Sequence, residues 1–310
     1  MPFPTTARAV GLALAMGLAA VPLADCAAME QTPHASLAAR LTDPRPLVVA
    51  HRGCWRSPAE NALAGLRACI DLGIDMVEID LRRTQDGVIV LLHDATLDRT
   101  TSLTGPLAQT PYATLAKARL KRGLGGPDAP FTKEAPPTFE QVLEASKGRI
   151  FLFLDIKDPI HAEVAELVRK HGAEQQVLFS VNAAFGPKVL TRALVGDSVL
   201  MPKFDQYSGS VCAPDLDPSA QAATYADLQT PIYEAVFCDD AFLKRVRARA
   251  GDAGLWVNAL GPRFMAGRDE AVALRDPDAV WGALLNLGVT AIQTDHPAEL
   301  SAYLRKTGRR

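Results

Sequence analysis

The sequence predicts a single α/β domain, a (β/α)8 barrel. Its 310 residues suffice for one barrel, and 48% of them are apolar against 22% charged, which supplies a full hydrophobic core. Short apolar runs alternate with segments of helical periodicity from residue 47 onward, with no low-complexity linker between them. This alternation is typical of a parallel sheet covered by helices, and the composition excludes a disordered chain.

Nine segments have the composition of strands, whereas a (β/α)8 barrel needs eight. Continuous apolar runs indicate strands that are buried on both faces, and Asp86-Gly87 predicts a turn between the second and the third run. The nine segments are 47–50, 76–81, 88–92, 150–156, 177–181, 198–201, 232–237, 255–257 and 291–294. We expect either 198–201 or 232–237 to be misassigned or to lie outside the barrel.

The N-terminus predicts an export signal. Arg8 precedes the apolar run Ala9–Leu23, which is shorter than the roughly 20 residues that span a bilayer. We therefore assign residues 1–28 to a signal peptide and 29–310 to one barrel domain. We expect a periplasmic or secreted protein that is not stably inserted in the membrane after cleavage. Lipidation of Cys26 is disfavoured because Asp25 stands where a lipoprotein signal has a small residue.

The charge balance of the chain argues against a nucleic-acid partner. Thirty-three Lys and Arg against 35 Asp and Glu give a net charge of −2 without a long basic run, so nucleic acid is not an expected partner.

Signal cleavage would leave Cys54, Cys69, Cys212 and Cys238 in an oxidising compartment. Among possible pairings we favour Cys212 with Cys238, and free buried thiols are an equal alternative. The oligomeric state is undetermined by the sequence.

Polar side chains gather where the predicted strands end. The carboxyl ends of all strands of a parallel barrel open on one face, which is where active sites lie. Side chains alternate along a strand, so Glu78 and Asp80 share one face of theirs. Asp155 and Lys157 do the same. We therefore expect one polar barrel mouth formed by His51, Arg52, Glu78, Asp80, His93, Asp155 and Lys157.

The residue types in this mouth indicate phosphodiester chemistry. Three converging carboxylates repel one another unless a cation neutralises them, and a set of oxygen ligands favours Mg²⁺ or Ca²⁺. The three carboxylates, one divalent cation, Arg52 and Lys157 together carry a charge of about +1, which the single negative charge of a phosphodiester would cancel. His51 and His93 can exchange protons near neutral pH. The set predicts acid–base hydrolysis of a small phosphodiester with one divalent cation.

The same motifs, taken in order, resemble the glycerophosphodiester phosphodiesterase family. The resemblance begins near Leu47 and is strongest up to Thr101. It consists of Ala50-His51-Arg52-Gly53, Glu60-Asn61, Val77-Glu78-Ile79-Asp80, Asp86-Gly87, His93-Asp94, Thr96–Thr101 and Ile292–Pro297.

This resemblance implies a (β/α)8 barrel with a small insertion at about 96–136 after the third strand. It implies hydrolysis of glycerophosphodiesters to sn-glycerol 3-phosphate and an alcohol, with His51 and His93 as the acid–base pair. The implied metal ligands are Glu78, Asp80 and Asp155, and the implied substrate-binding residues are Arg52, Lys157, Glu60, Asn61 and Trp256.

The chain departs from the family pattern at two of these positions. Asp155 stands where the family usually has Glu, so the metal distance or identity could differ. The late strand offers a shortened Trp256-Val257-Asn258 motif, in which Trp256 either lines the alcohol pocket or packs. Two alternatives to the hydrolase follow: phospholipase-D-like or lyase action on lysophospholipids, and a non-catalytic phosphodiester-binding protein. We expect His161 to be solvated.

Overall fold

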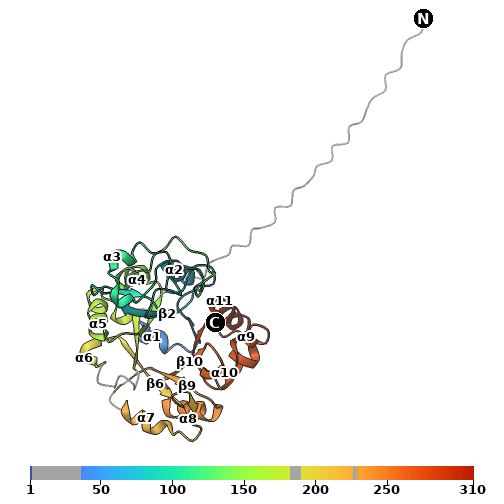
Figure 1. Cartoon of the computed structure of the whole chain (residues 1–310). Coiled ribbons are helices and arrows are strands. Elements are labelled where there is room, and N and C mark those ends of the chain that lie inside the picture. The colour runs from blue at the N-terminus through green and yellow to red at the C-terminus, as the bar shows by residue number, and fades with distance from the viewer. Residues whose placement is uncertain (2–35, 182–189, 226–227, 229) are drawn as a thin grey trace. The chain divides into compact units, whose positions relative to one another are not determined.

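The computed structural model describes residues 1, 36–181, 190–225, 228 and 230–310 (Figure 1). Within them, eight parallel strands close into a barrel, because β1 (Leu47–Ala50) pairs with both β2 (Met76–Arg83) and β11 (Ala291–Thr294). The strands between β2 and β11 are β4 (Phe151–Ile156), β5 (Val177–Val181), β6 (Val199–Asp205), β9 (Ile232–Val236) and β10 (Gly254–Ala259). The predicted (β/α)8 fold is confirmed. The predicted signal peptide lies outside the described residues, apart from Met1.

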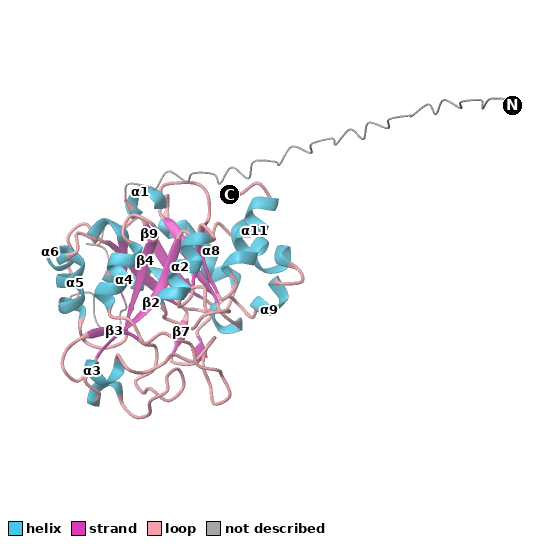
Figure 2. Ribbon diagram, turned by 90° about the horizontal axis from the view of Figure 1, so that it is seen from above, coloured by secondary structure: helices cyan, strands magenta, loops and turns pink. Residues whose placement is uncertain are grey.

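Helices cover the barrel on its outside and at one end. Figure 2 shows α1 at one end of the strands and β3 and α3 at the other. Among the described residues, no helix is long and apolar enough to cross a membrane. The helices are α1 (Leu37–Leu41), α2 (Leu63–Asp71), α3 (Tyr112–Leu115), α4 (Phe139–Ser146), α5 (His161–Lys170), α6 (Arg192–Val195), α7 (Pro218–Thr224), α8 (Asp240–Ala250), α9 (Glu270–Ala273), α10 (Ala283–Asn286) and α11 (Pro297–Lys306).

The strand that lies outside the barrel is neither of the two that we expected. Segments 198–201 and 232–237 both supply barrel strands, β6 and β9, and the strand outside the barrel is β3 (Ile89–Leu91). It pairs antiparallel with the end of β2. The physical reason is the tight turn at Gly87, with φ of +88°, since a short turn can join only antiparallel strands, whereas a parallel return needs a crossover of about a dozen residues or more. His93 therefore reaches the mouth from a hairpin that extends β2.

Alternation along the strands divides the barrel interior into an apolar and a polar part. Side chains that point outward pack against the helices and form the larger core. Inside the barrel a second apolar cluster fills the amino-terminal half. It includes Leu37 of α1 together with Met76, Phe153, Leu178, Met201, Ile232 and Trp256. The interior positions nearer the carboxyl ends are polar, so the apolar cluster forms a solid base under the barrel mouth.

A buried carboxylate fastens α1 and the C-terminal residue Arg310 to the bottom of the barrel. Asp75 Oδ1 accepts hydrogen bonds from Nε and Nη2 of Arg40 at 3.1 and 3.0 Å. Its Oδ2 accepts from the backbone N–H of Val48 at 3.0 Å and from Arg310. The Asp75 and Arg40 side chains are only 9% and 4% exposed, so water screens this pair weakly.

Replacement of Asp75 by alanine is expected to lower the free energy of unfolding by about 3 to 5 kcal/mol, because it leaves a buried guanidinium without its partner. Urea unfolding measures this difference. Asp43→Ala is the matched control, since it breaks an ion pair whose Arg45 is 47% exposed and should cost less than about 1 kcal/mol. Equal losses in the two variants would contradict the assigned role of Asp75.

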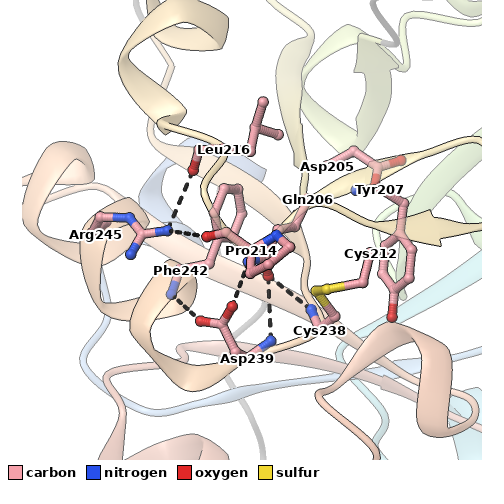
Figure 3. The surroundings of a disulfide bond; sticks show 10 residues. All are labelled: Asp205, Gln206, Tyr207, Cys212, Pro214, Leu216, Cys238, Asp239, Phe242 and Arg245. Atoms are coloured by element: carbon pink, nitrogen blue, oxygen red, sulfur yellow. Dashed lines mark hydrogen bonds between the residues drawn. A yellow bond between two sulfur atoms is a disulfide. The ribbon is translucent and has the colours of Figure 1, made fainter.

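The described residues contain two disulfides, and one of them is the predicted pair. Cys212 of β8 (Val211–Cys212), which forms a small hairpin with β7 (Tyr207–Ser208), bonds to Cys238 just after β9 (Figure 3). The buried Gln206 beside it accepts from the backbone N–H of Cys238 at 2.8 Å, which joins the ends of β6 and β9. The second bond, Cys54–Cys69, links the loop after β1 to α2 and was not singled out by the sequence.

Candidate active site

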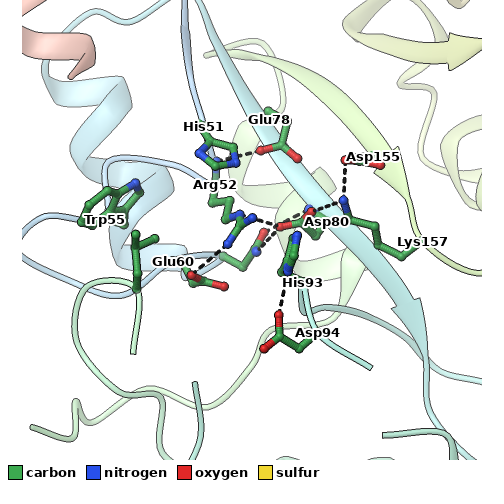
Figure 4. Close-up of polar contacts among 12 residues, drawn as sticks. His51, Arg52, Trp55, Glu60, Glu78, Asp80, His93, Asp94, Asp155 and Lys157 are labelled. Carbon is green, nitrogen blue, oxygen red and sulfur yellow. Dashed lines mark hydrogen bonds and ion pairs between the residues drawn. The ribbon is translucent and has the colours of Figure 1, made fainter. Parts of the chain in front are cut away.

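A cavity of about 420 Å³ occupies the carboxyl end of the barrel. Six of the predicted residues line it: His51, Arg52, Glu78, His93, Asp155 and Lys157. They come from the ends of β1, β2 and β4 and from the hairpin that follows β2, as Figure 4 shows. The predicted polar mouth is therefore assembled in the structure.

Strand register brings the three carboxylates together. Asp80 on β2 and Asp155 on β4 are register partners, and Glu78 lies two residues before Asp80 on the same interior face. One oxygen of each carboxylate lies within 4.8 Å of the others. Glu78 and Asp80 are each 1% exposed, whereas Asp155 is partly open to the cavity.

Burial and like charges make this cluster unfavourable without a cation. Burial, and then the neighbouring Asp80 and Asp155 carboxylates, raise the pKa of Glu78 well above its ordinary value. Lys157 offsets part of this charge, with Nζ at 2.6 Å from Asp155 and 3.0 Å from Asp80. The cluster fits a hard divalent cation, because it offers only carboxylate oxygens and because the negative charge of Glu78 is poorly compensated by its neighbours.

The turn after β1 aims Arg52 into the cluster. Arg52 has φ of +53° and Gly53 has φ of +84°, so two successive residues adopt the left-handed region. This turn lets the Arg52 backbone N–H donate to Glu78 Oε2 at 2.8 Å. The Arg52 guanidinium lies 3.2 Å from Glu60 and 3.4 Å from Asp80. One residue thus contacts the cluster through both its backbone and its side chain.

Each of the two candidate catalytic histidines has a carboxylate at Nδ1. His51 Nδ1 lies 2.8 Å from Asp295 Oδ1, and His93 Nδ1 lies 2.6 Å from Asp94 Oδ1. Burial alone would raise the pKa of Asp295, but the hydrogen bonds with His51 and Trp55 and the charges of His51 and Arg52 together outweigh burial, so the pKa lies below its ordinary value. A carboxylate at Nδ1 fixes the ring orientation and leaves Nε2 for proton exchange.

Glu60 and Asn61 lie behind the cavity and support the residues that line it. Asn61 Nδ2 donates to Asp80 Oδ2 at 2.7 Å, and the Asp80 backbone N–H donates to Asn61 Oδ1 at 3.1 Å. Glu60 accepts from Arg52 and, at 2.8 Å for each of two nitrogens, from Arg99. The two residues are 2% and 3% exposed and are not part of the cavity lining, so they position Arg52 and Asp80, whereas the resemblance implied that they bind the substrate.

Arg99 shows that the insertion after β3 takes part in the site. Its Nε lies 2.7 Å from Asp94 Oδ2, so it holds the carboxylate that orients His93. Arg99 belongs to the Thr96–Thr101 motif of the resemblance but was not assigned to the site, because it lies in a Gly/Pro/Thr-rich segment whose path over the mouth is set by its own small apolar cluster.

Two further residues differ in position from what the sequence implied, Trp256 and His161. Trp256 is fully buried, packs edge-on against Phe153 at 5.1 Å between ring centroids, and is not part of the cavity lining. Its interior position lies one layer below the mouth, so it packs and does not face a substrate. His161 lines the cavity from the start of α5, although we expected it to be solvated, and burial lowers its pKa.

Several lining residues were missed by the sequence reasoning. They are Ser180, Lys203, Glu234, Asn258, Gln293 and Asp295. Lys203 and Glu234 lie on β6 and β9, whose place in the barrel was uncertain, whereas Asn258, Gln293 and Asp295 fall within motifs of the resemblance but were not assigned to the site. The available signal was a charged residue at an interior position of an otherwise apolar strand, as for Lys203 in β6 and Glu234 in β9.

A buried carboxyl group, Glu270, holds the strand end that carries Asp295. It accepts hydrogen bonds from the Asp295 backbone N–H at 3.1 Å and from the Thr294 hydroxyl. Burial raises the pKa of Glu270 from 4.5 to about 8.

This raised pKa predicts a pH-dependent stability. Between pH 4.5 and about 8 the folded protein keeps the Glu270 proton that the unfolded chain releases, so the free energy of unfolding should fall as the pH rises through this window. Glu270→Gln should flatten that decline in urea unfolding. The exposed Glu140, replaced by Gln, should leave the decline unchanged. An unaltered slope in Glu270→Gln would contradict the assignment.

The fold and the site together define a (β/α)8 barrel with an acidic and histidine-rich mouth suited to phosphoryl chemistry. Residues 51–196 match the model of the Glycerophosphoryl diester phosphodiesterase family, and residues 214–304 match a domain of unknown function. The matched segment carries the two histidines and the three carboxylates, and the predicted resemblance to the glycerophosphoryl diester phosphodiesterase family is confirmed.

Similar proteins agree with this assignment. The chain is 30% identical over 145 residues to a glycerophosphodiester phosphodiesterase of Caldanaerobacter subterraneus, a match that covers 44% of this chain and 58% of that protein. It is 34% identical over 151 residues to human glycerophosphodiester phosphodiesterase 1, covering 46% of this chain and 43% of the relative. The chain thus spans about half the length of the curated relatives it matches.

Solved structures share the fold at lower identity. A glycerophosphoryl diester phosphodiesterase from Parabacteroides distasonis has a TM-score of 0.69 at 22% identity, over 86% of this chain and 88% of that one. An Oleispira antarctica phosphodiesterase, described in complex with the product sn-glycerol-3-phosphate, has a TM-score of 0.60 at 23% identity, over 84% and 97%. These likenesses establish the barrel fold.

Proposed function

We propose that this protein is an exported, metal-dependent phosphodiesterase that hydrolyses glycerophosphodiesters to sn-glycerol 3-phosphate and an alcohol. The observation that carries the proposal is the assembly, around one cavity, of three carboxylates and two histidines, each histidine with a carboxylate at Nδ1. The family match of residues 51–196 supports it, as does the product described with the Oleispira antarctica enzyme.

Binding of the phosphodiester falls to the charged groups at the ends of β1, β2 and β4. Arg52 and Lys157 line the cavity and can neutralise the phosphate charge. Glu78, Asp80 and Asp155 would hold one divalent cation, Mg²⁺ or Ca²⁺. Such a cation, when bound, stabilises negative charge on the phosphate oxygens.

Proton transfer falls to the two histidines. Because a carboxylate contacts Nδ1 of each imidazole, Nε2 is the ring nitrogen that remains for proton exchange in the cavity. One histidine accepts the proton of the attacking hydroxyl group, from water or from the glycerol of the substrate. The other donates a proton to the oxygen of the leaving alcohol. The arrangement is similar for both rings, so either residue can serve in either role.

Export is the part of the proposal that rests on the N-terminal sequence. Residues 1–28 combine one early positive charge, an apolar run and small residues near the expected cleavage site. The two disulfides support an oxidising compartment, because structural disulfides are uncommon in reducing cytosol.

The test is ³¹P NMR of the protein with glycerophosphocholine and, separately, with lysophosphatidylcholine, each with Mg²⁺, with Ca²⁺ and with EDTA. Metal-dependent release of glycerol 3-phosphate from glycerophosphocholine is the expected result. Turnover of lysophosphatidylcholine alone, especially to a cyclic phosphate, would replace the proposal by lysophospholipid cleavage. Binding of glycerophosphocholine without turnover would indicate a non-catalytic binding protein.

A further inference from the structure

The side of the cavity away from the carboxylate cluster is formed by five polar side chains, which we call the polar wall. They project from β5, β6, β9, β10 and β11, and all of them line the cavity. Strand register makes Lys203 a partner of Glu234 and Asn258 a partner of Gln293. The members of the polar wall are Ser180, Lys203, Glu234, Asn258 and Gln293. The mechanism above uses none of them.

Glu234 is held firmly through one of its two oxygens. Oε1 lies 2.9 Å from Lys203 Nζ and accepts a hydrogen bond from Asn258 Nδ2, also at 2.9 Å. Asn258 is fixed in turn by Trp256, whose Nε1 donates to Asn258 Oδ1 at 2.7 Å. The carboxylate is 1% exposed, so its orientation is set by these contacts.

Two acceptors of the polar wall have no hydrogen-bond partner among the described residues. They are Glu234 Oε2 and Gln293 Oε1, on side chains that are 1% and 4% exposed. Buried acceptors in folded proteins nearly always receive a hydrogen bond, and an unsatisfied one is costly. Because both side chains line the cavity, a ligand in the cavity can supply the missing donors.

Charge decides which donors fit. Lys203 compensates the Glu234 carboxylate, so the polar wall carries no net negative charge to attract an ammonium group. A trimethylammonium group has no N–H or O–H to donate, and it is usually bound by a cage of aromatic rings. The aromatic rings of the described lining, other than histidine, are those of Phe153 and Phe264. Neutral hydroxyl groups satisfy both acceptors without introducing charge.

We propose that the polar wall binds adjacent hydroxyl groups of a phosphate-linked polyol, with Glu234 Oε2 and Gln293 Oε1 accepting hydrogen bonds from them. This inference rests on the proposed function for the phosphodiester itself and names the chemistry of the group attached to it. Glu234 and Gln293 are then specificity-determining residues, whereas the groups on β1, β2 and β4 carry out the reaction. The polyol is the glycerol half of the substrate or a hydroxyl-rich alcohol half.

The first test compares the binding of three phosphate monoesters by calorimetry: sn-glycerol 3-phosphate, myo-inositol 1-phosphate and phosphocholine. At least one polyol phosphate should bind about tenfold or more tightly than phosphocholine. Gln293→Leu should reduce that ratio about five- to tenfold, as expected for the loss of one hydrogen bond. Glu234→Gln should reduce the ratio as well, even though the freed charge of Lys203 strengthens the binding of all three anions.

Controls separate specificity from folding. The exposed Glu140 on α4, replaced by Gln, matches Glu234→Gln in chemistry and should leave the ratio unchanged. Each variant is compared with the parent by its thermal midpoint, and the ratio is read only for folded protein. Glu234→Gln provides the second measurement if Gln293→Leu does not fold. Equal affinity for polyol phosphates and phosphocholine, or an unchanged ratio in the folded wall variants, would overturn the inference.

Turnover then distinguishes the source of the polyol. If the polar wall takes the alcohol half, kcat/KM for glycerophosphoinositol should exceed that for glycerophosphocholine, and Gln293→Leu should remove the difference. If it takes the glycerol half, Gln293→Leu should raise KM equally for both diesters. Polyol preference without hydrolysis would refute the proposed function and keep this inference. Hydrolysis without a polyol preference in binding would support the proposed function and refute this inference.

Discussion

Alanine at His51 or at His93 is expected to lower kcat for glycerophosphocholine by about 10²- to 10⁴-fold, the contribution of a positioned acid or base. The reason is that each ring lines the cavity and has its Nδ1 bound to a carboxylate, which leaves Nε2 as the proton-exchanging atom. Initial rates of glycerol 3-phosphate release by ³¹P NMR measure the effect.

Two further variants sharpen this prediction. Asp295→Asn should lower kcat less than His51→Ala, because the ring remains but loses the charged partner of Nδ1. His171→Ala is the matched control, since His171 pairs with Glu140 and Glu144 on the outer helix layer and should not affect kcat. Near-normal turnover in both His51→Ala and His93→Ala would refute the acid–base assignment.

Glu78→Gln is expected to abolish most activity while stabilising the metal-free protein. Burial and the adjacent carboxylates raise the pKa of Glu78, so above its ordinary pKa of 4.5 the folded state is destabilised by this group. A neutral amide of the same shape removes that repulsion, and the thermal midpoint in EDTA should rise. The same change removes one of three cation ligands, so activity should fall and be partly restored by excess Mg²⁺ or Ca²⁺.

The cation provides the control for this second prediction. In the parent protein, Mg²⁺ or Ca²⁺ should raise the thermal midpoint, because a ligand that binds only the folded state stabilises it by mass action. In Glu78→Gln that increase should be much smaller. A parent protein whose activity and thermal midpoint are both insensitive to EDTA would remove the metal from the mechanism.

The barrel mouth has two halves of different composition. The ends of β1, β2 and β4 carry the carboxylate cluster, Arg52 and Lys157, whereas β5, β6, β9, β10 and β11 carry the polar wall. The insertion adds Arg99, which bridges Glu60 and Asp94 and so connects the support of Arg52 to that of His93. A change in the polar wall should therefore alter substrate choice with less effect on the chemistry.

The local sequence alone was enough to predict the barrel and the half of its mouth that carries the carboxylate cluster. Apolar runs at regular intervals predict buried parallel strands, and the period of two along a strand places Glu78 and Asp80 on one face. Parallel strands of a barrel open on one face, so polar residues at successive strand ends are brought together by the topology itself. For the same reason the sequence alone predicts that Asp155 and Lys157 belong to the cluster.

Only the tertiary structure decided which strands close the barrel and which side chains reach the cavity from its far side. β3 has the composition of a barrel strand, yet the turn at Gly87 returns it antiparallel, and this depends on local geometry that composition does not encode. Lys203 and Glu234 are isolated charges in sequence and become a pair because β6 lies next to β9. Trp256 is removed from the cavity by its depth in the barrel interior, and depth depends on the stagger between neighbouring strands, which the sequence of one strand does not contain.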